Sequence, residues 1–221
     1  MTSAEDFAFV DCAGLDTAAA YRLVVGCVVP RPIAWITTVD AAGRVNAAPF
    51  SSYNYVATSP PMLAVNIAQR AGDGAIKDTA RNIRDSGEFV VNVATEETME
   101  AMHATGFEYP PEQSEALALD LALLPSRHVR VPRLAATPVQ MECRLDKIVP
   151  LGRGVNTLYI GEVVAFHLAH RVYDGTRVDS VAMRPVARLG GPYYAALGEI
   201  IHRPMLQRPP GGEGWTGAEK P

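Results

Sequence analysis

The sequence predicts a mostly β fold, an antiparallel barrel into which several helices are inserted. Segments that alternate apolar with polar side chains and are rich in β-branched residues dominate the chain, as is typical of strands. Short turn-forming segments join successive strands, which favours antiparallel hairpins. Evenly spaced alternation of strands and helices is absent, so a doubly wound parallel sheet is disfavoured. We expect the strands to close into a barrel, because closure removes exposed strand edges.

The first hairpin is expected between residues 33 and 51. Residues 33–39 alternate apolar and polar side chains imperfectly and contain several β-branched residues, which predicts a strand. Residues 40–43, Asp-Ala-Ala-Gly, have the composition of a turn, and Gly43 can take a positive φ. Residues 45–51 then return as the partner strand.

A strand and a helix are expected next. Residues 62–67 predict a strand that starts after the pair Pro60-Pro61, because proline blocks earlier ladder pairing. Residues 76–86 predict a helix, which Gly87 ends as the residue after the last turn. The apolar face of this helix is expected to carry Ile76, Ala80 and Ile83.

Two long strands close the predicted fold. A Gly-Arg-Gly loop at 152–154 joins them, which indicates a hairpin. The remaining elements are a buried strand at 88–94, helices at 96–104 and 114–119, and the two long strands at 139–148 and 156–168.

The composition limits how many domains the chain can form and which classes of partner it can bind. The chain has 221 residues, 48% of them hydrophobic, which is enough for one large domain with a substantial core. We expect one domain over residues 1–202 and a tail rich in proline and glycine over residues 203–221. The net charge of −4 argues against nucleic acid or an anionic membrane surface as the main partner.

The cysteines and histidines give no sign of a disulfide framework or a metal site. Cys12, Cys27 and Cys143 are far apart, and we expect Cys27 to be buried. His167 and His170 are three residues apart on or beside a predicted strand, so their rings would point to opposite faces. These features, with no signal peptide or membrane span evident, favour a reducing cytoplasm.

Hydroxyl groups and one lysine suggest a site for a phosphate and a polar heterocycle. Thr37, Thr38, Ser51 and Ser52 can supply donors where the strands of the first hairpin end. The predicted helix start adds a second set of donors, because its free backbone N–H groups and its dipole favour an anion. The side chains expected there are Lys77 and Thr79.

Asp78 opposes this hypothesis, because a carboxylate at the helix start would repel a phosphate. We expect Asp78 to cap the helix or to pair with Arg81 and to point away from the ligand.

Four consecutive motifs carry a family resemblance. They are RPIAWITT at 31–38, NAAPFSSYN at 46–54, SPPM at 59–62 and KDTARNI at 77–83. In this order they resemble the flavin reductase-like family, the FMN-binding split β-barrels. Later segments resemble further landmarks of that family: EFVVN at 88–92, TPVQMEC at 137–143, IGEV at 160–163 and RLGGPYY at 188–194.

The resemblance implies an antiparallel split β-barrel with a flavin site at a homodimer interface. The flavin would be FMN or FAD, and NADH or NADPH would be the co-substrate. The cofactor-binding residues that it implies are Thr37, Thr38, Ser51, Ser52, Lys77 and Thr79 toward the phosphate, Ala48, Phe50 and Asn54 near the ring, and Arg31 and Arg188 as further anion partners. The residues that could line the interface are Trp35, Tyr53, Tyr55, Tyr193 and Tyr194.

Three functions remain open at this point. The first is an NAD(P)H:flavin reductase that supplies reduced flavin to a partner monooxygenase. It needs no general acid, because the flavin itself carries the hydride chemistry, and no catalytic side chain is assigned. The second is a flavin-binding electron carrier without nicotinamide turnover, since no GxGxxG stands at a strand–helix junction. The third is a split barrel adapted to another small-molecule reaction.

Overall fold

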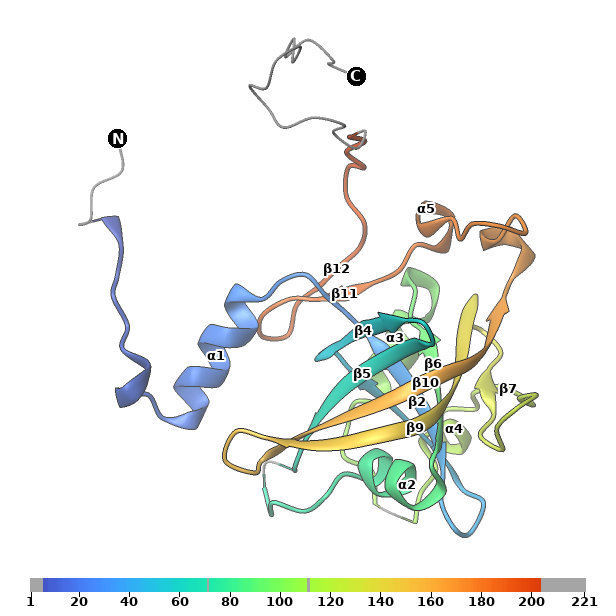
Figure 1. The fold of residues 1–221 in the computed structure, drawn as a ribbon, viewed down its shortest axis with the longest axis horizontal. Helices are drawn as coiled ribbons and strands as arrows, with labels where there is room; N and C mark the ends of the chain where they lie inside the picture. Colours follow the sequence, from blue (N-terminus) through green and yellow to red (C-terminus); the bar gives the residue numbers. More distant parts are fainter. Residues whose placement is uncertain (1–5, 71, 111, 204–221) are drawn as a thin grey trace.

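A curved seven-stranded antiparallel sheet forms the body of the protein (Figure 1). The computed structural model describes residues 6–70, 72–110 and 112–203. The sheet has the strand order β3-β2-β6-β9-β10-β5-β4 and wraps around one apolar core as a split β-barrel. Its strands are β2 (Ala34–Val39), β3 (Val45–Phe50), β4 (Tyr53–Thr58), β5 (Pro61–Ala68), β6 (Glu88–Val93), β9 (Val139–Leu151) and β10 (Asn156–Leu168).

Two small sheets lie outside the barrel. One joins β1 (Arg31–Pro32), β11 (Ala187–Arg188) and β12 (Tyr194–Ala195), so it brings the start of the barrel next to a segment from near the end of the chain. The other pairs β7 (Leu123–Leu124) with β8 (Arg133–Leu134).

Short helices fill the connections. The α-helices are α1 (Thr17–Cys27), α2 (Asp78–Ser86), α3 (Met99–Ala104), α4 (Glu115–Ala118) and α5 (Ser180–Met183). The 3-10 turns are η2 (Cys12–Gly14), η3 (Glu96–Thr98) and η4 (His170–Val172). Helix α1 stands apart from the barrel (Figure 1), whereas α2 packs against strands β2 and β3.

Strand β2 is buried on both faces. Ala34 and Ile36 face the core inside the barrel. Ile33 and Trp35 belong to a second apolar cluster on the outer side, where Met102 of α3 packs against them. The strand therefore reads as a nearly continuous apolar run, which explains why its alternation was imperfect in the sequence.

The expected antiparallel pairings are confirmed. Strand β2 pairs with β3, and β9 pairs with β10 over most of its length. In the turn between β2 and β3, Asp40 Oδ1 accepts hydrogen bonds from the backbone N–H groups of Ala42 and Arg44. Gly43 has φ +81°, and Gly87 ends α2 with φ +71°.

Several details differ from the expectations. The α-helices and strands that were not predicted are helices α1 and α5, strand β4 and the two-residue strands β1, β7, β8, β11 and β12. Strand β5 begins at Pro61 rather than after it, and α2 begins at Asp78 rather than at residue 76. Ile76 therefore precedes the helix and is exposed. Cys27, expected to be buried, is exposed at the end of α1.

The tail expected at 203–221 lies, except for residue 203, outside the described residues. Among the helices of the described chain, none is both long enough and apolar enough to cross a membrane.

Candidate functional site

The start of helix α2 is one wall of the candidate site. Lys77 is its N-cap residue, with extended backbone and no side-chain capping bond, so the first N–H groups of the helix are left without a side-chain acceptor. Within the described part of the chain, the Lys77 ammonium group has no hydrogen bond or ion pair. The side chain of Asn46 on β3 lies 2.9 Å from Thr79 Oγ1 and fixes this hydroxyl at the same helix start.

Asp78 does not place a free negative charge at the helix start. Its Oδ2 accepts a 2.6 Å hydrogen bond from Arg70, and its Oδ1 pairs with Arg81. The expected pairing with Arg81 is confirmed, and Arg70 adds a second guanidinium. The expectation that Asp78 points away from the ligand is wrong, because Asp78 lines the helix-start cavity. Because two cations share one carboxylate, the helix start stays favourable for an anion.

Two adjoining cavities open beside Lys77. The smaller one, which we call the helix-start cavity, has a volume of about 70 Å³. The larger one, the arm cavity, has a volume of about 430 Å³. The two share Pro49, Lys77, Gly106 and Phe107. The helix-start cavity is also lined by Asn46, Ala48, Phe50, Arg70, Asp78, Thr79, Thr105, Glu108, Tyr109 and Glu115, and the arm cavity by Tyr21, Val25, Arg31, Ser51, His103, Arg188, Leu189, Gly191 and Tyr194.

Arg31 holds the arm cavity together. Its guanidinium donates to the carbonyl oxygens of Val25 and Val28, at 2.6 and 2.5 Å, at the end of α1. It also donates to Leu189 O at 2.8 Å and lies 3.5 Å from Ser51 Oγ. Most of its donors are therefore used by backbone carbonyls, so Arg31 positions the wall of the cavity.

Arg188, Tyr194 and His103 form a chain of contacts along the same cavity. Arg188 donates to the hydroxyl of Tyr194 at 2.6 Å, and its guanidinium also lies over the tyrosine ring. His103 Nδ1 lies 2.9 Å from the same hydroxyl. The arrangement connects the guanidinium and the imidazole through one phenol, whose hydroxyl can donate a hydrogen bond to the imidazole or accept one from it.

Seven of the eleven predicted site residues line these cavities, and four do not. Ala48, Phe50 and Thr79 line the helix-start cavity, Arg31, Ser51 and Arg188 line the arm cavity, and Lys77 lines both. Thr37 and Thr38 are fully buried: Thr37 donates to Pro132 O at 2.7 Å, and Thr38 accepts from Asn82 at 3.0 Å. Ser52 and Asn54 are exposed beyond the end of β3.

Several lining residues were not predicted, and Glu115 is one of them. It is buried, accepts a hydrogen bond from Ala47 N at 3.2 Å, and burial raises the pKa of its carboxyl group. His103 and Phe107 were also missed, and Tyr194 was expected only as an interface residue. The sequence gives one local signal near Glu115, a serine at position 114 that can cap a helix start. In the structure Ser114 Oγ accepts a hydrogen bond from Leu117 N.

A family model described as a flavin reductase like domain matches residues 25–182 of this chain. The chain belongs to the flavin reductase-like family. The matched region begins within α1 and ends in α5, so it contains the barrel and all the strands that border the helix-start cavity.

Family members of known sequence or structure resemble the chain over most of its length. An uncharacterized protein, BH2278, from Halalkalibacterium halodurans is 40% identical over 194 residues, which are 85% of this chain and 92% of that protein. The crystal structure of nitrilotriacetate monooxygenase component B from Bacillus cereus has a TM-score of 0.85 at 34% identity and covers 89% of this chain and 98% of its own. The 2-nitrobenzoate 2-nitroreductase NbaA of Pseudomonas fluorescens has a TM-score of 0.84 at 32% identity, with coverages of 93% and 100%.

The chemistry of the two cavities fits a flavin mononucleotide. An unpaired ammonium group and a helix N-terminus suit the phosphate, and the apolar walls of Ala48, Pro49 and Phe50 suit a ring face. Together the cavities have the size range of ordinary ligand sites.

Proposed function

We propose that this protein is an FMN-dependent oxidoreductase that takes electrons from NADH or NADPH and passes them on as reduced flavin to a partner oxygenase. The observation that carries the proposal is Lys77 at the start of α2, which has no partner among the described residues and lies beside the two cavities. Membership of the flavin reductase-like family supports the cofactor class. The likeness to a monooxygenase component B supports the partner class.

Lys77 and Thr79 would hold the phosphate of the cofactor. Lys77 supplies a positive charge, Thr79 a hydroxyl that Asn46 already orients, and α2 its first backbone N–H groups. Ser51 adds a hydroxyl from the far side of the arm cavity. Thr37, Thr38, Ser52 and Asn54 line neither cavity, so we give them no direct contact within one subunit.

The bound flavin would supply hydride acceptance and donation, which no side chain of this protein provides. The walls of the two cavities would then have three tasks. Ala48 and Phe50 would orient the ring, Phe107 would limit the access of water to the cavities, and the Tyr194 hydroxyl would hold a proton between Arg188 and His103. The arm cavity leaves room for a second, anionic substrate beside Arg188.

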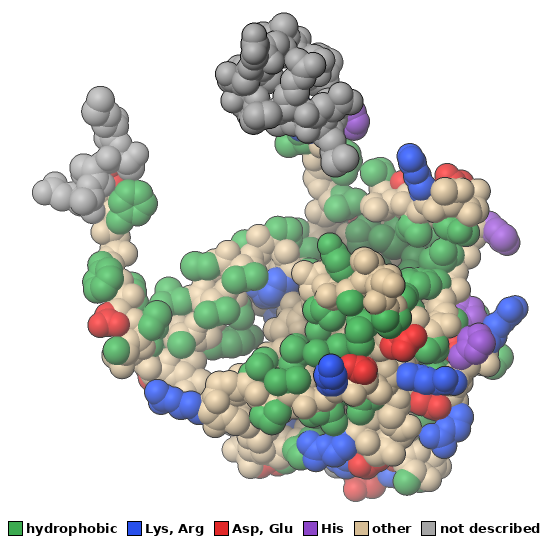
Figure 2. Space-filling model, in the orientation of Figure 1, with side chains coloured by type: hydrophobic (Ala, Val, Ile, Leu, Met, Phe, Trp, Pro, Cys, Tyr) green, Lys and Arg blue, Asp and Glu red, His purple; other side chains and the backbone are tan. Residues whose placement is uncertain are grey.

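A homodimer is part of the proposal. Helix α1 has no buried residue, and Tyr21 and Val24 are 67% and 60% exposed. Figure 2 shows hydrophobic side chains on the surface of α1 and of the barrel. An isolated helix of 11 residues is marginally stable in water, so α1 needs a further apolar contact. A second copy of the chain would cover it and complete the arm cavity, to which Tyr21 and Val25 contribute.

The expected interface residues fall into two groups. Tyr55 and Tyr193 are 68% and 67% exposed and are available to a partner. The other three are not. Trp35 is fully buried inside the subunit, Tyr53 packs against the barrel core, and Tyr194 is half-buried beside Arg188 and His103.

The test is flavin binding followed by anaerobic reduction with NADH or NADPH. We expect the purified protein to bind FMN saturably and the flavin absorbance near about 450 nm to bleach on addition of one of the two donors. Lys77→Ala should weaken FMN binding by about tenfold or more, since a hydrogen bond to a charged group contributes about 1.5–3 kcal/mol. Lys147→Ala is the matched control, because Lys147 is exposed on β9, away from both cavities.

Three other outcomes would change the assignment of the function or of the phosphate site. FMN binding without bleaching by either nicotinamide would favour the electron carrier. A protein that neither binds FMN nor consumes NAD(P)H would overturn the proposal in favour of another reaction. Equal effects of the two lysine substitutions would remove Lys77 from the site.

A further inference from the structure

A third cavity, larger than the other two, lies outside the candidate flavin site. It has a volume of about 670 Å³ and opens between the end of β10 and the loop that joins β7 to β8. We call it the loop cavity. Its lining shares no residue with the helix-start cavity or the arm cavity. Figure 1 shows β7 on the opposite side of the barrel from α1, so the two regions are well separated.

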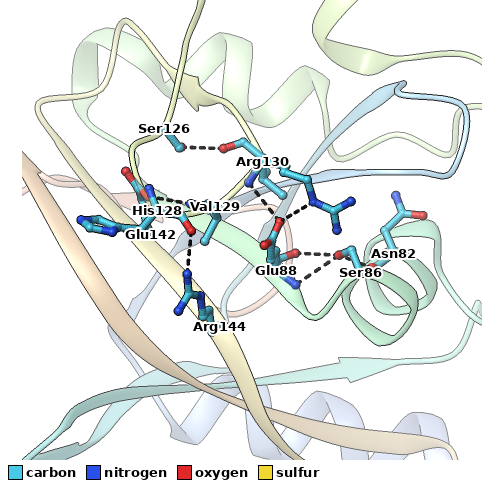
Figure 3. A network of polar contacts seen from close by, with 10 residues as sticks. Asn82, Ser86, Glu88, Ser126, His128, Val129, Arg130, Glu142 and Arg144 are labelled. Carbon is cyan, nitrogen blue, oxygen red and sulfur yellow. Dashed lines mark hydrogen bonds and ion pairs between the residues drawn. The ribbon is translucent and has the colours of Figure 1, made fainter.

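Glu142 of β9 fixes the loop that borders this cavity. Its side chain is fully buried, and its oxygens accept hydrogen bonds from the backbone N–H groups of Arg127, His128 and Val129 at 2.8, 2.6 and 3.1 Å. His167 Nε2 of β10 lies 2.5 Å from the same carboxylate. Figure 3 shows Glu142 beside the loop with His128 and Val129.

The negative charge of Glu142 is satisfied within the protein. Burial opposes ionisation of this carboxyl group, but the loop N–H groups and His167 outweigh burial, and the pKa of Glu142 is lowered. A second carboxylate, Glu88, accepts from Arg130 N and Nε on the same loop. Both carboxylates are therefore used to hold the backbone, and neither lines the cavity.

Two arginines supply the charge among the described residues that line the cavity. Arg127 is exposed, and within the described residues its guanidinium has no hydrogen bond or ion pair. The guanidinium of Arg133 donates to Pro125 O at 3.2 and 3.1 Å and to Gln140 Oε1 at 2.8 Å, which orients it without neutralising it. His128 and His167 also line the cavity, and no aspartate or glutamate is among the described residues that line it.

Most of the other lining residues are apolar, and Thr137 and Gln140 add two polar side chains. Leu124, Pro138, Phe166 and Leu168 lie around the same cavity, and Phe166 is 53% exposed. A solvent-facing aromatic ring beside two guanidinium groups suits a ligand with a charged end and an apolar body. A bare inorganic anion would leave this wall unused, and a metal ion would meet no carboxylate from the described lining.

We propose that the loop cavity binds a small organic carboxylate with an aromatic or branched apolar body, held by Arg127 and Arg133. The carboxylate would accept hydrogen bonds from the two guanidinium groups, and its body would pack on Phe166 and Leu124. The loop is held in place by Glu142 before the ligand arrives, so little ordering accompanies binding. This site is independent of the proposed flavin chemistry.

Benzoate is the probe for this proposal. Titration of the full chain, without added flavin, would be followed by calorimetry and by NMR of the histidine side chains. We expect saturable binding of one benzoate per chain, with shifts at His128 and His167. Arg127→Gln should weaken binding about tenfold or more, and it removes no hydrogen bond within the described structure. The matched control is Arg153→Gln on the exposed loop between β9 and β10.

Two comparisons make the test decisive. Phosphate should bind at least tenfold more weakly than benzoate, because it cannot use the apolar wall; equal affinity would overturn the assignment of the ligand class. Phe166→Ser should weaken benzoate binding and leave thermal stability almost unchanged, since Phe166 is exposed. Absence of benzoate binding, or binding that persists unchanged in Arg127→Gln, would overturn the proposal whatever the flavin experiments show.

Discussion

The indole nitrogen of Trp35 donates a 2.9 Å hydrogen bond to the hydroxyl of Thr105, and both residues are buried. The same hydroxyl donates to Met102 O at 2.7 Å. This pair connects β2 to the end of α3, directly before Gly106 and Phe107, which line both parts of the candidate site.

Thr105→Val should test this connection. The substitution keeps the shape of the side chain but leaves the indole N–H buried without an acceptor, which costs about 1–3 kcal/mol of unfolding free energy. Chemical denaturation is the measurement, with Thr58→Val on exposed β4 as the control. In the background of Trp35→Phe, Thr105→Val should cost markedly less; a cost independent of residue 35 would contradict the role of this hydrogen bond.

Gly161→Ala should destabilise the barrel by overpacking. A Cβ atom at this position would lie 2.6 Å from Cζ of Phe89 and 3.1 Å from Arg144 O, next to a register shift between β9 and β10. The expected loss is about 1–3 kcal/mol of unfolding free energy. Phe89→Leu should relieve part of the clash, so the double variant should be more stable than additivity predicts. Gly152→Ala is not a suitable control, because Gly152 has φ +56°; Gly198→Ala is, because a Cβ there meets nothing within 4 Å.

Glu142→Gln should lower stability near neutral pH and flatten its dependence on pH in acid. Because the pKa of Glu142 is lowered in the folded protein, its contribution is complete above the unfolded value of about 4.3 and is lost as the pH falls through the folded pKa. The amide leaves a loop N–H without a good acceptor, at a cost of about 1–3 kcal/mol at pH 7.

The measurement is denaturation of both proteins between pH 7 and pH 3. The difference between them should shrink as the pH falls. A difference in unfolding free energy that does not change with pH would mean that Glu142 stabilises the protein by its packing and not by its charge.

Val24→Asp should disrupt the proposed dimer. The charge is placed on the exposed apolar surface of α1, where Val24 is 60% exposed and no residue of the helix is buried. Sedimentation equilibrium should give a dimer of the 23.7 kDa chain for the wild type and a shift toward monomer for the variant. Arg22→Asp on the same helix serves as the matched charge control. A wild-type protein that remains monomeric would exclude the proposed interface.

Local patterns predicted most of the barrel. The β2–β3 hairpin follows from alternation plus the chemistry of the Asp40–Gly43 turn, and both signals lie within a few residues of each other. Helix α1 escaped prediction because none of its residues is buried, so no core-facing apolar stripe marks it in the sequence. Strand β4 is short, largely exposed and at the end of the sheet, and its pairing with β5 leaves little trace in its own composition.

The same distinction holds for the candidate site: residues with a local sequence signature were predicted, and residues placed by contacts distant in the sequence were not. Lys77 and Thr79 were predictable because a helix start has a local signature. The contact between His103 and Tyr194 joins residues 91 positions apart, and Glu115 reaches Ala47 across 68. Thr37 and Thr38 have suitable hydroxyls, but burial and partners such as Asn82 depend on the whole fold.

The bond from Arg31 to Leu189 also bears on how the chain matures. The two residues are 158 positions apart, and among the described strands β1 pairs with β11 from the same late region of the chain. During synthesis on the ribosome, which proceeds at about 5–20 residues per second, the last barrel strand, β10, emerges before this anchor. Helix α1 is therefore synthesised first, but Arg31, which binds the end of this helix, contacts Leu189 only after the barrel strands are complete. A chain that is truncated before residue 189 and released from the ribosome should fold its barrel while α1 stays open to protease.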